Sequence, residues 1–272
     1  MLKYCNDLHV HTNLSVCAPR DSYASNYIPY CKEENVKVLG FVNHVYNRKR
    51  MAEEHPEFKG TPGEYPLLIR DEVEGLKAKN KDIKILLGCE AETVYNGEFL
   101  VSHEESKLYD YVFLAPSHIC NMLGEYDYLN LDTPDKLRDF MLMRFKDACK
   151  IQLAVPTAIC HPLYPIGSPF EQEVVDGITE LELEECFKLA KENNKAIEVH
   201  ACLFRKGTKH NDDGISPSYL RMLSVAKECG CKFFLGTDAH SVDGFLGTHA
   251  KLLKASDYLG IGEDDLWEVG RI

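Results

Sequence analysis

Asp7-Leu8-His9-Val10-His11 alternates ionisable and apolar side chains over five residues. Alternate side chains of an extended strand share one face, so Asp7, His9 and His11 are expected to point together, with the two apolar side chains opposite. Two imidazoles at this spacing can bind one cation, and a carboxylate behind them can orient an imidazole. The alternative is an amphipathic strand with two solvent-facing histidines, and this stretch alone does not decide between the two.

Further apolar runs recur along the chain with helical patterns between them. The seven expected strands are residues 7–11, 36–43, 83–89, 111–115, 155–160, 196–199 and 232–236. They are short and rich in Val, Ile, Leu and Phe, which is typical of parallel strands covered by helices. The expected helices are residues 25–35, 65–79, 134–153, 179–193 and 217–229, with shorter pieces after residues 244 and 263. This alternation predicts a parallel sheet with right-handed crossovers.

Local signals mark where several of these helices begin. Two begin with a hydroxyl residue followed by proline, at 133–134 and 216–217, and Thr179-x-x-Glu182 has the form of a capping box. Segment 47–63 contains several prolines and glycines, so we expect a long loop over the active face.

Length and composition indicate an ordinary globular domain. The chain has 272 residues, 44% of them hydrophobic and 27% charged, which is suitable for one large α/β domain. It begins without the apolar run of a signal peptide, and no segment reaches membrane-spanning length, so a cytoplasmic location is expected. The 11 cysteines include no CxxC pair and several lie in apolar runs, which favours buried free thiols over a disulfide framework.

The net charge of −12 argues against a nucleic-acid partner, because binding to a phosphate backbone depends on clustered Lys and Arg. The longest basic cluster, Arg48-Lys49-Arg50, is too small to change this. An acidic protein can still act on a phosphate if metal ions make its site locally positive.

Ionisable residues gather at the carboxyl ends of the expected strands. They are His9, His11, His44, Glu90, His118, His161, His200, Asp238 and His240. In a barrel of parallel strands these ends meet at one mouth, where such barrels place their chemistry. Chance placement would scatter the 11 histidines, yet only His55, His103, His210 and His249 lie outside this pattern. The distribution therefore favours the metal-binding interpretation of the first strand.

With these residues placed, the chain resembles the PHP (polymerase and histidinol phosphatase) family of metal-dependent phosphoesterases. The resemblance rests on six ordered motifs: Asp7-Leu8-His9-Val10-His11, Phe41-Val42-Asn43-His44, Gly88-Cys89-Glu90, Pro116-Ser117-His118, Cys160-His161-Pro162 and Gly236-Thr237-Asp238-Ala239-His240. It implies a distorted, TIM-like (β/α)7 barrel with the metal site at the carboxyl ends of the strands, over residues 1–272 as a single domain. This agrees with the seven strands expected from the apolar pattern.

The resemblance also implies a cluster of two or three divalent metal ions. His9, His11, Glu90 and Asp238 would bind the first ion; Glu90 would bridge to a second bound by His118 and His161; His44 and His240 would belong to a third. Imidazole and carboxylate ligands with little thiolate suit Zn, Mn or Fe.

Two departures from the family pattern concern the third ion. Asn43 stands where the family usually has an aspartate before the histidine of the second motif. Cys17 stands where some members place another histidine. Cys17 or Asp21 could complete the third shell, and the alternative for each is a structural role, so the number of ions stays open.

The residues support phosphate-ester chemistry. Only Glu90 and Asp238 bring formal negative charge to the expected ligand set, so two divalent cations would leave the mouth locally positive. Glu90 and Asp238 would act in catalysis by holding metals about 3.5–4 Å apart, with a bridging hydroxide aimed at phosphorus. Arg205, His200 and Arg48 are the candidate contacts to the substrate.

We therefore expect a hydrolase of small phosphomonoesters, with histidinol phosphate as the leading substrate, and neither a nucleic-acid nor a membrane partner. Two alternatives remain: a nuclease or phosphodiesterase using the same metals, and a non-catalytic metal-bound module that binds a ligand. Oligomeric state cannot be read from these patterns.

Overall fold

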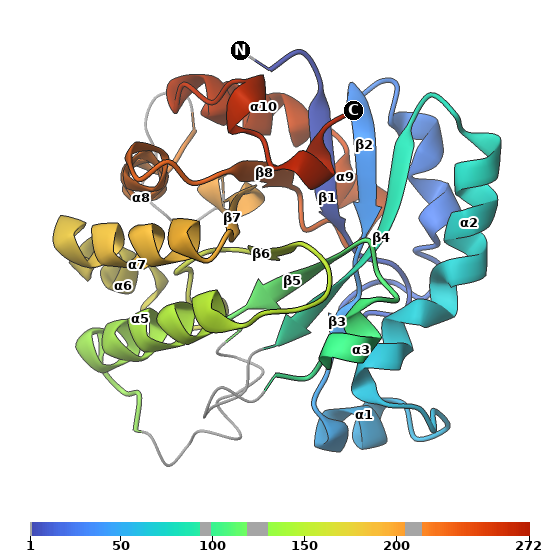
Figure 1. Ribbon diagram of the computed structural model, residues 1–272, viewed down its shortest axis with the longest axis horizontal. Coiled ribbons are helices and arrows are strands. Elements are labelled where there is room, and N and C mark those ends of the chain that lie inside the picture. The colour runs from blue at the N-terminus through green and yellow to red at the C-terminus, as the bar shows by residue number, and fades with distance from the viewer. Residues whose placement is uncertain (1, 93–98, 119–129, 205–213) are drawn as a thin grey trace.

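The computed structural model describes residues 2–92, 99–118, 130–204 and 214–272, and within these ranges seven parallel strands close into a barrel (Figure 1). The strands are β1 (Cys5–Val10), β2 (Val36–Phe41), β4 (Lys84–Glu92), β5 (Tyr111–Ala115), β6 (Thr157–Ile159), β7 (Ala196–His200) and β8 (Phe233–Gly236). Their order is β2-β1-β8-β7-β6-β5-β4, and pairing of β2 with β4 closes the ring. The two-residue β3 (His44–Val45) continues the path of β2 along β4. The predicted TIM-like (β/α)7 barrel is confirmed.

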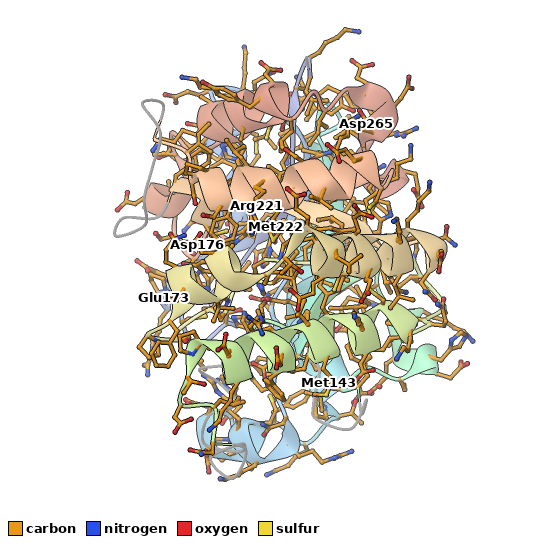
Figure 2. All side chains as sticks on the ribbon, turned by 90° about the vertical axis from the view of Figure 1, so that its left-hand side faces the viewer. Met143, Glu173, Asp176, Arg221, Met222 and Asp265 are labelled. Atoms are coloured by element: carbon orange, nitrogen blue, oxygen red, sulfur yellow. The ribbon has the colours of Figure 1, made fainter. Side chains whose placement is uncertain are left out.

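Helices surround this barrel. They are α1 (Arg48–Glu54), α2 (Arg70–Lys79), α3 (His103–Ser106), α5 (Pro134–Lys150), α6 (Glu171–Gly177), α7 (Glu180–Glu192), α8 (Pro217–Glu228), α9 (Val242–Phe245) and α10 (His249–Tyr258). Figure 2 shows α5, α7 and α8 lying across one flank. On this flank Met222 of α8 is buried, whereas Met143 of α5 is 40% exposed, as expected for helices with one face on the barrel. No helix in the described ranges has the length and apolar composition needed to cross a bilayer.

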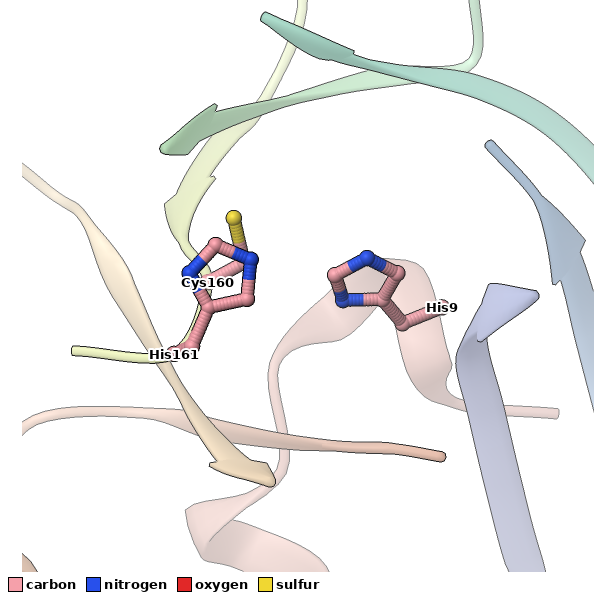
Figure 3. Close-up of side chains that lie close together, drawn as sticks. All are labelled: His9, Cys160 and His161. Atoms are coloured by element: carbon pink, nitrogen blue, oxygen red, sulfur yellow. The ribbon is translucent and has the colours of Figure 1, made fainter. Parts of the chain in front are cut away.

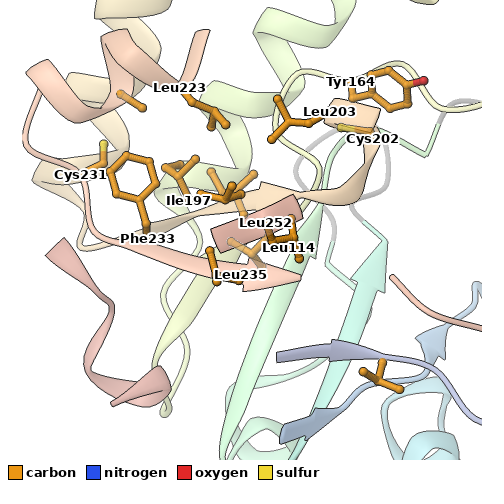
Figure 4. Close-up of a cluster of buried hydrophobic side chains, with 14 of the residues drawn as sticks. Leu114, Tyr164, Ile197, Cys202, Leu203, Leu223, Cys231, Phe233, Leu235 and Leu252 are labelled. Carbon is orange, nitrogen blue, oxygen red and sulfur yellow. The ribbon is translucent and has the colours of Figure 1, made fainter. Parts of the chain in front are cut away.

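Apolar side chains form two layers. The larger cluster lies between strands and helices, where Ile197, Phe233 and Leu235 of the barrel meet Leu223 of α8 and Leu252 of α10 (Figure 4). The second fills the barrel itself and includes Leu8, Phe113, Phe234 and Trp267. The rings of Phe113 and Phe234 stack with centroids 4.6 Å apart. The barrel is therefore a packed core and not a pore.

Three local predictions were wrong, and each has a physical reason. Residues 25–35 form two short 3-10 turns, Ala24–Asn26 and Ile28–Tyr30, because Pro29 lacks the N–H that an α-helix would need there. Segment 47–63 is not simply a loop, since Asn47 accepts a hydrogen bond from the Arg50 N–H and begins α1. Ser216 precedes Pro217 as expected, but its hydroxyl does not cap α8.

Candidate metal centre

The predicted metal-ligating side chains converge at the carboxyl ends of the strands. They are His9 and His11 at the end of β1, His44 in β3, Glu90 in β4, His118 after β5, His161 after β6, and Asp238 and His240 after β8. Most have no more than 5% of their surface exposed. This brings together side chains that are far apart in the sequence, as the barrel topology requires.

Four of these side chains are spaced as ligands of one ion would be. Nε2 of His11 lies 3.2 Å from Nε2 of His9, 3.3 Å from Oε2 of Glu90 and 3.0 Å from Oδ1 of Asp238. Nε2 of His9 lies 3.5 Å from each of the same two oxygens. Around a tetrahedral zinc ion with bonds of about 2.1 Å, neighbouring ligand atoms are about 3.4 Å apart. The residues therefore fit a metal ion.

The environment of Glu90 supports the same conclusion. Its Oε2 is buried and lies 2.9 Å from Nδ1 of His44, in addition to the two imidazole nitrogens above, yet it forms no hydrogen bond in the described part of the chain. A buried carboxylate oxygen without a partner is costly. Nitrogens and oxygen that approach closely without hydrogen-bond geometry are aimed at a common point, which a cation would satisfy.

The other oxygen of Glu90 faces a second group of ligands. Oε1 lies 2.7 Å from Nε2 of His161 and 3.3 Å from Nε2 of His118. The two imidazole rings stack with centroids 4.6 Å apart, and Ser117 Oγ pairs with Nδ1 of His161. Each oxygen of Glu90 thus serves a different group, which is the arrangement of a bridging carboxylate.

Cys160 also faces this interior, contrary to the expectation for a residue next to His161 in a strand. Figure 3 shows the two side chains across the barrel from His9. The chain leaves β6 at Ile159 and His161 has a positive φ of 30°, so strand alternation no longer applies. Cys160 Sγ contacts Oε1 of Glu90 at 3.5 Å. Burial, together with Glu90, raises the pKa of Cys160 well above its usual value, which favours the neutral thiol while no cation is bound.

His44 and His240 form a more open third group. The rings of both stack on His11, with centroids 4.5 and 4.3 Å away. Cys17 Sγ lies 3.2 Å from Nε2 of His44, whereas Asp21 lines a separate surface pocket. Cys17 is thus the better placed of the two candidates for completing this group.

Glu198 is a buried carboxylate that the sequence analysis missed. Its Oε1 lies 2.8 Å from Nδ1 of His9, and its Oε2 accepts a hydrogen bond of 2.6 Å from the N–H of His161. It therefore orients ligands of both groups. The available signal was strand periodicity, because Ala196, Glu198 and His200 alternate along β7 and share the face that points into the barrel.

Smaller polar residues orient other ligands. Ser15 Oγ pairs with Nδ1 of His11 at 2.9 Å, and Ser15 in turn donates to Oδ1 of Asn43 at 2.9 Å. Asn43 also accepts a hydrogen bond from the Thr12 N–H. Asn43 thus supports His11 indirectly even though it is not an aspartate.

Asp7 does not orient the imidazoles of His9 and His11 from behind, as strict alternation predicted, although its Oδ1 accepts a hydrogen bond of 3.2 Å from the His9 N–H. The pairing of β1 with β2 is irregular between Asp7 and Val10, so Leu8 and His9 both face the interior and Asp7 faces α10. There Asp7 Oδ2 lies 2.9 Å from Nε2 of His249. Asp7 also accepts hydrogen bonds from the N–H and hydroxyl of Thr237, and so helps to position the segment that carries Asp238.

The protonation states of the ligands follow from burial and from the charges around them. Although burial acts in the opposite direction, the surrounding imidazoles hold the pKa values of Glu90 and Asp238 well below their usual range. Burial lowers the pKa values of His161 and His240 to about 4. These four side chains are therefore unprotonated at neutral pH, which is the state that binds metal. For His9, His11 and His118 burial is outweighed by the neighbouring carboxylates, which raise their pKa values, so a cation must displace protons from these imidazoles.

The three candidate substrate contacts differ in their placement. His200 has a buried Nε2 without a hydrogen-bond partner in the described ranges, 3.4 Å from Oδ2 of Asp238, while its Nδ1 accepts the N–H of Cys202 at 3.0 Å. Because Nδ1 accepts this hydrogen bond, Nε2 is the ring nitrogen that carries hydrogen and acts as a donor. Arg48 is exposed at the start of α1, where its charge acts on Glu105. Arg205 lies outside the described residues.

The fold and the site together define the class of this protein. It is a TIM-like barrel that carries a cluster of histidines and carboxylates at its mouth. No protein-family model matches the chain, and no curated protein matches it by sequence. The structure of histidinol phosphate phosphatase from Lactococcus lactis, complexed with zinc, L-histidinol and phosphate, is similar with a TM-score of 0.66 and 18% identity, over 96% of this chain and 95% of that one. A putative histidinol phosphatase from Listeria monocytogenes is similar with a TM-score of 0.67 and 16% identity, over 90% and 99%. At these identities the comparisons establish the shared fold.

Proposed function

We propose that this protein is a metal-dependent phosphomonoesterase of the PHP family, acting on a small phosphate ester. The observation that carries the proposal is the sharing of Glu90, whose two oxygens face two separate groups of buried imidazoles. His9, His11 and Asp238 would hold one ion with Glu90, and His118 with His161 would hold the other. The similarity to the zinc-containing phosphatase structure supports this proposal.

Two divalent cations in these positions would supply Lewis acidity toward phosphoryl oxygens and lower the pKa of a water molecule. Zn, Mn or Fe are the expected metals because the ligand set combines imidazole with carboxylate. The protein's own residues orient the groups. Glu198 pairs with the His9 imidazole and accepts a hydrogen bond from the His161 N–H, and Ser15 pairs with the His11 imidazole. His200 presents its Nε2–H to a substrate oxygen, where a hydrogen bond would stabilise charge that develops on the leaving group.

Histidinol phosphate is the substrate that we propose to test first, because the Lactococcus lactis structure holds L-histidinol and phosphate. The protein is purified without chelator, its bound metals are quantified by mass spectrometry, and phosphate release is measured with Zn or Mn supplied. We expect at least two ions per chain and metal-dependent release from small monoesters. Fewer than one ion per chain after reconstitution, or no phosphate release from any monoester, would contradict the proposal. A cytoplasmic location of the protein remains a prediction from sequence.

A further inference from the structure

A cavity of about 370 Å³ opens beside the metal centre. Asp238 and His200 line its inner end, next to the proposed metals. Tyr164, Ile166 and Phe204 provide an apolar wall. This volume is at the lower end of the range for small-molecule sites, so the cavity suits the alcohol part of a small ester and not a polymer.

The inner end of the cavity offers a hydrogen-bond donor. His200 is only 6% exposed and its Nδ1 is occupied by the backbone of Cys202, while its Nε2 lies 3.4 Å from Asp238 Oδ2 without forming a hydrogen bond in the described ranges. A buried donor without a partner is costly unless a ligand pairs with it. The cavity is therefore a place where a ligand oxygen is needed.

The outer end of the cavity is positive. Lys251 lines it, in the first turn of the ten-residue helix α10, and Thr248 lines it at the helix N-cap. No acidic residue lies in that first turn, and no side chain caps it. The Lys251 ammonium lies 5.9 Å from the centre of the Phe204 ring, and no carboxylate within the described ranges pairs with it. The helix N-terminus adds a partial positive charge to that of the ammonium.

The geometry points to a specificity pocket for phosphomonoesters whose alcohol carries an anionic group, with Lys251 as the residue that recognises it. This inference rests on the proposed function, since the phosphate must occupy the metal centre while the alcohol extends toward α10. A cationic alcohol, such as the L-histidinol bound in the Lactococcus lactis structure, finds a poorer match there, because Asp238 is the one acidic residue that lines the described cavity and it faces the imidazoles of the metal centre. The pocket therefore predicts that histidinol phosphate is hydrolysed less efficiently than an ester with an anionic alcohol.

The test compares three small esters that differ in charge at the end remote from phosphate. They are 3-phosphoglycerate, glycerol 3-phosphate and phosphoethanolamine, whose remote groups are a carboxylate, a hydroxyl and an ammonium. For the metal-loaded wild type we expect kcat/KM to fall in that order. For Lys251→Met we expect a loss of about fivefold in kcat/KM for the carboxylate ester, mainly through KM, with the hydroxyl ester unchanged. Lys251→Glu should reverse the order.

Lys254→Met is the matched control, because it removes one lysine from the same helix at a position that does not line the cavity. Equal kcat/KM for the three esters, or the same small change in both lysine variants, would overturn the pocket assignment and leave the phosphatase assignment standing. No hydrolysis of any ester by metal-loaded protein would overturn both. Lys251 is exposed, so its variants should fold, and their melting temperatures verify this.

Discussion

The two ends of the barrel treat buried polar groups in opposite ways. At the amino-terminal end, Asn6 donates to the Gly270 carbonyl and accepts the Leu235 N–H, while the Lys195 ammonium donates to Ile151 O and Thr157 Oγ1. At the carboxyl-terminal mouth, Glu90 Oε2 is buried beside imidazole nitrogens without a hydrogen bond. The buried polar groups named at the amino-terminal end thus find hydrogen-bond partners within the protein. The buried carboxylate oxygen at the mouth would be paired by a bound cation. We therefore expect substitutions at the amino-terminal end to change mainly stability, and substitutions at the mouth to change mainly function.

Glu90→Gln should have the largest effect, and it should affect function only. The neutral amide cannot bridge two cations, so we expect both ions to be lost and turnover to fall about a thousandfold, equivalent to ~4 kcal/mol. Metal content and phosphate release measure this, with the circular dichroism spectrum as the control for folding. Retention of two ions with turnover within tenfold of the wild type would refute the role of Glu90.

Trp267→Ala should show the opposite behaviour. Trp267 is 3% exposed, packs edge-on to Tyr111 and belongs to the barrel-interior cluster far from the mouth. Truncation should lower the free energy of unfolding by about 3–5 kcal/mol. Denaturant unfolding measures the loss, and turnover at low temperature should stay close to that of the wild type. A large loss of turnover in protein that is still folded would break the separation between the two ends.

Lys195, at the amino-terminal end of the barrel, should make the free energy of unfolding depend on pH. Burial lowers the pKa of Lys195 to about 8, whereas in the unfolded chain it is about 10.4. Between these values the unfolded chain binds the extra proton, so the free energy of unfolding should rise with pH, by up to about 3 kcal/mol from pH 7.5 to 10.5. The measurement is the difference in unfolding free energy between the wild type and Lys195→Met, and a difference that does not vary with pH would contradict it.

Glu198→Gln should weaken metal binding at the mouth without abolishing it. Glu198 contacts His9 and the backbone of His161 and is not itself expected to bind metal. Loss of its charge should reduce metal affinity by about 10–100-fold, as for other residues that orient ligands. Competition with a chelator measures the affinity. If affinity is unchanged while unfolding free energy falls, Glu198 is only a structural residue.

Cys17→Ser should have the smallest effect. Cys17 contacts the open third group through His44. If two ions suffice, metal content and turnover should stay within about threefold of the wild type, less than 1 kcal/mol. Loss of one ion per chain would instead show that Cys17 completes a third site.

The chain order of strands and the residues at their ends could be predicted from sequence, because parallel topology brings every carboxyl end to one mouth regardless of loop details. What alternation alone could not predict was the direction of individual side chains. The irregular pairing in β1 turns the Asp7 carboxylate away from the His9 imidazole. The positive φ of His161 brings the Cys160 side chain inward. Glu198 was missed because the alternation along β7 predicts that its carboxylate faces inward but does not identify His9 as its partner. Pro29 and Ser216 show that a helical pattern or a capping residue does not guarantee its usual structure.

His249 shows how far the metal centre extends beyond its ligands. It lies between Asp7 of β1 and Glu34, at 2.9 Å from each, and begins the helix that carries Lys251. These carboxylates, acting against burial, raise the pKa of His249, which favours its protonated form between them. A loss-of-function screen would therefore flag His249 together with the ligands, although its hydrogen bonds go to Asp7 and Glu34. Such a screen would outline a unit larger than the set of metal ligands.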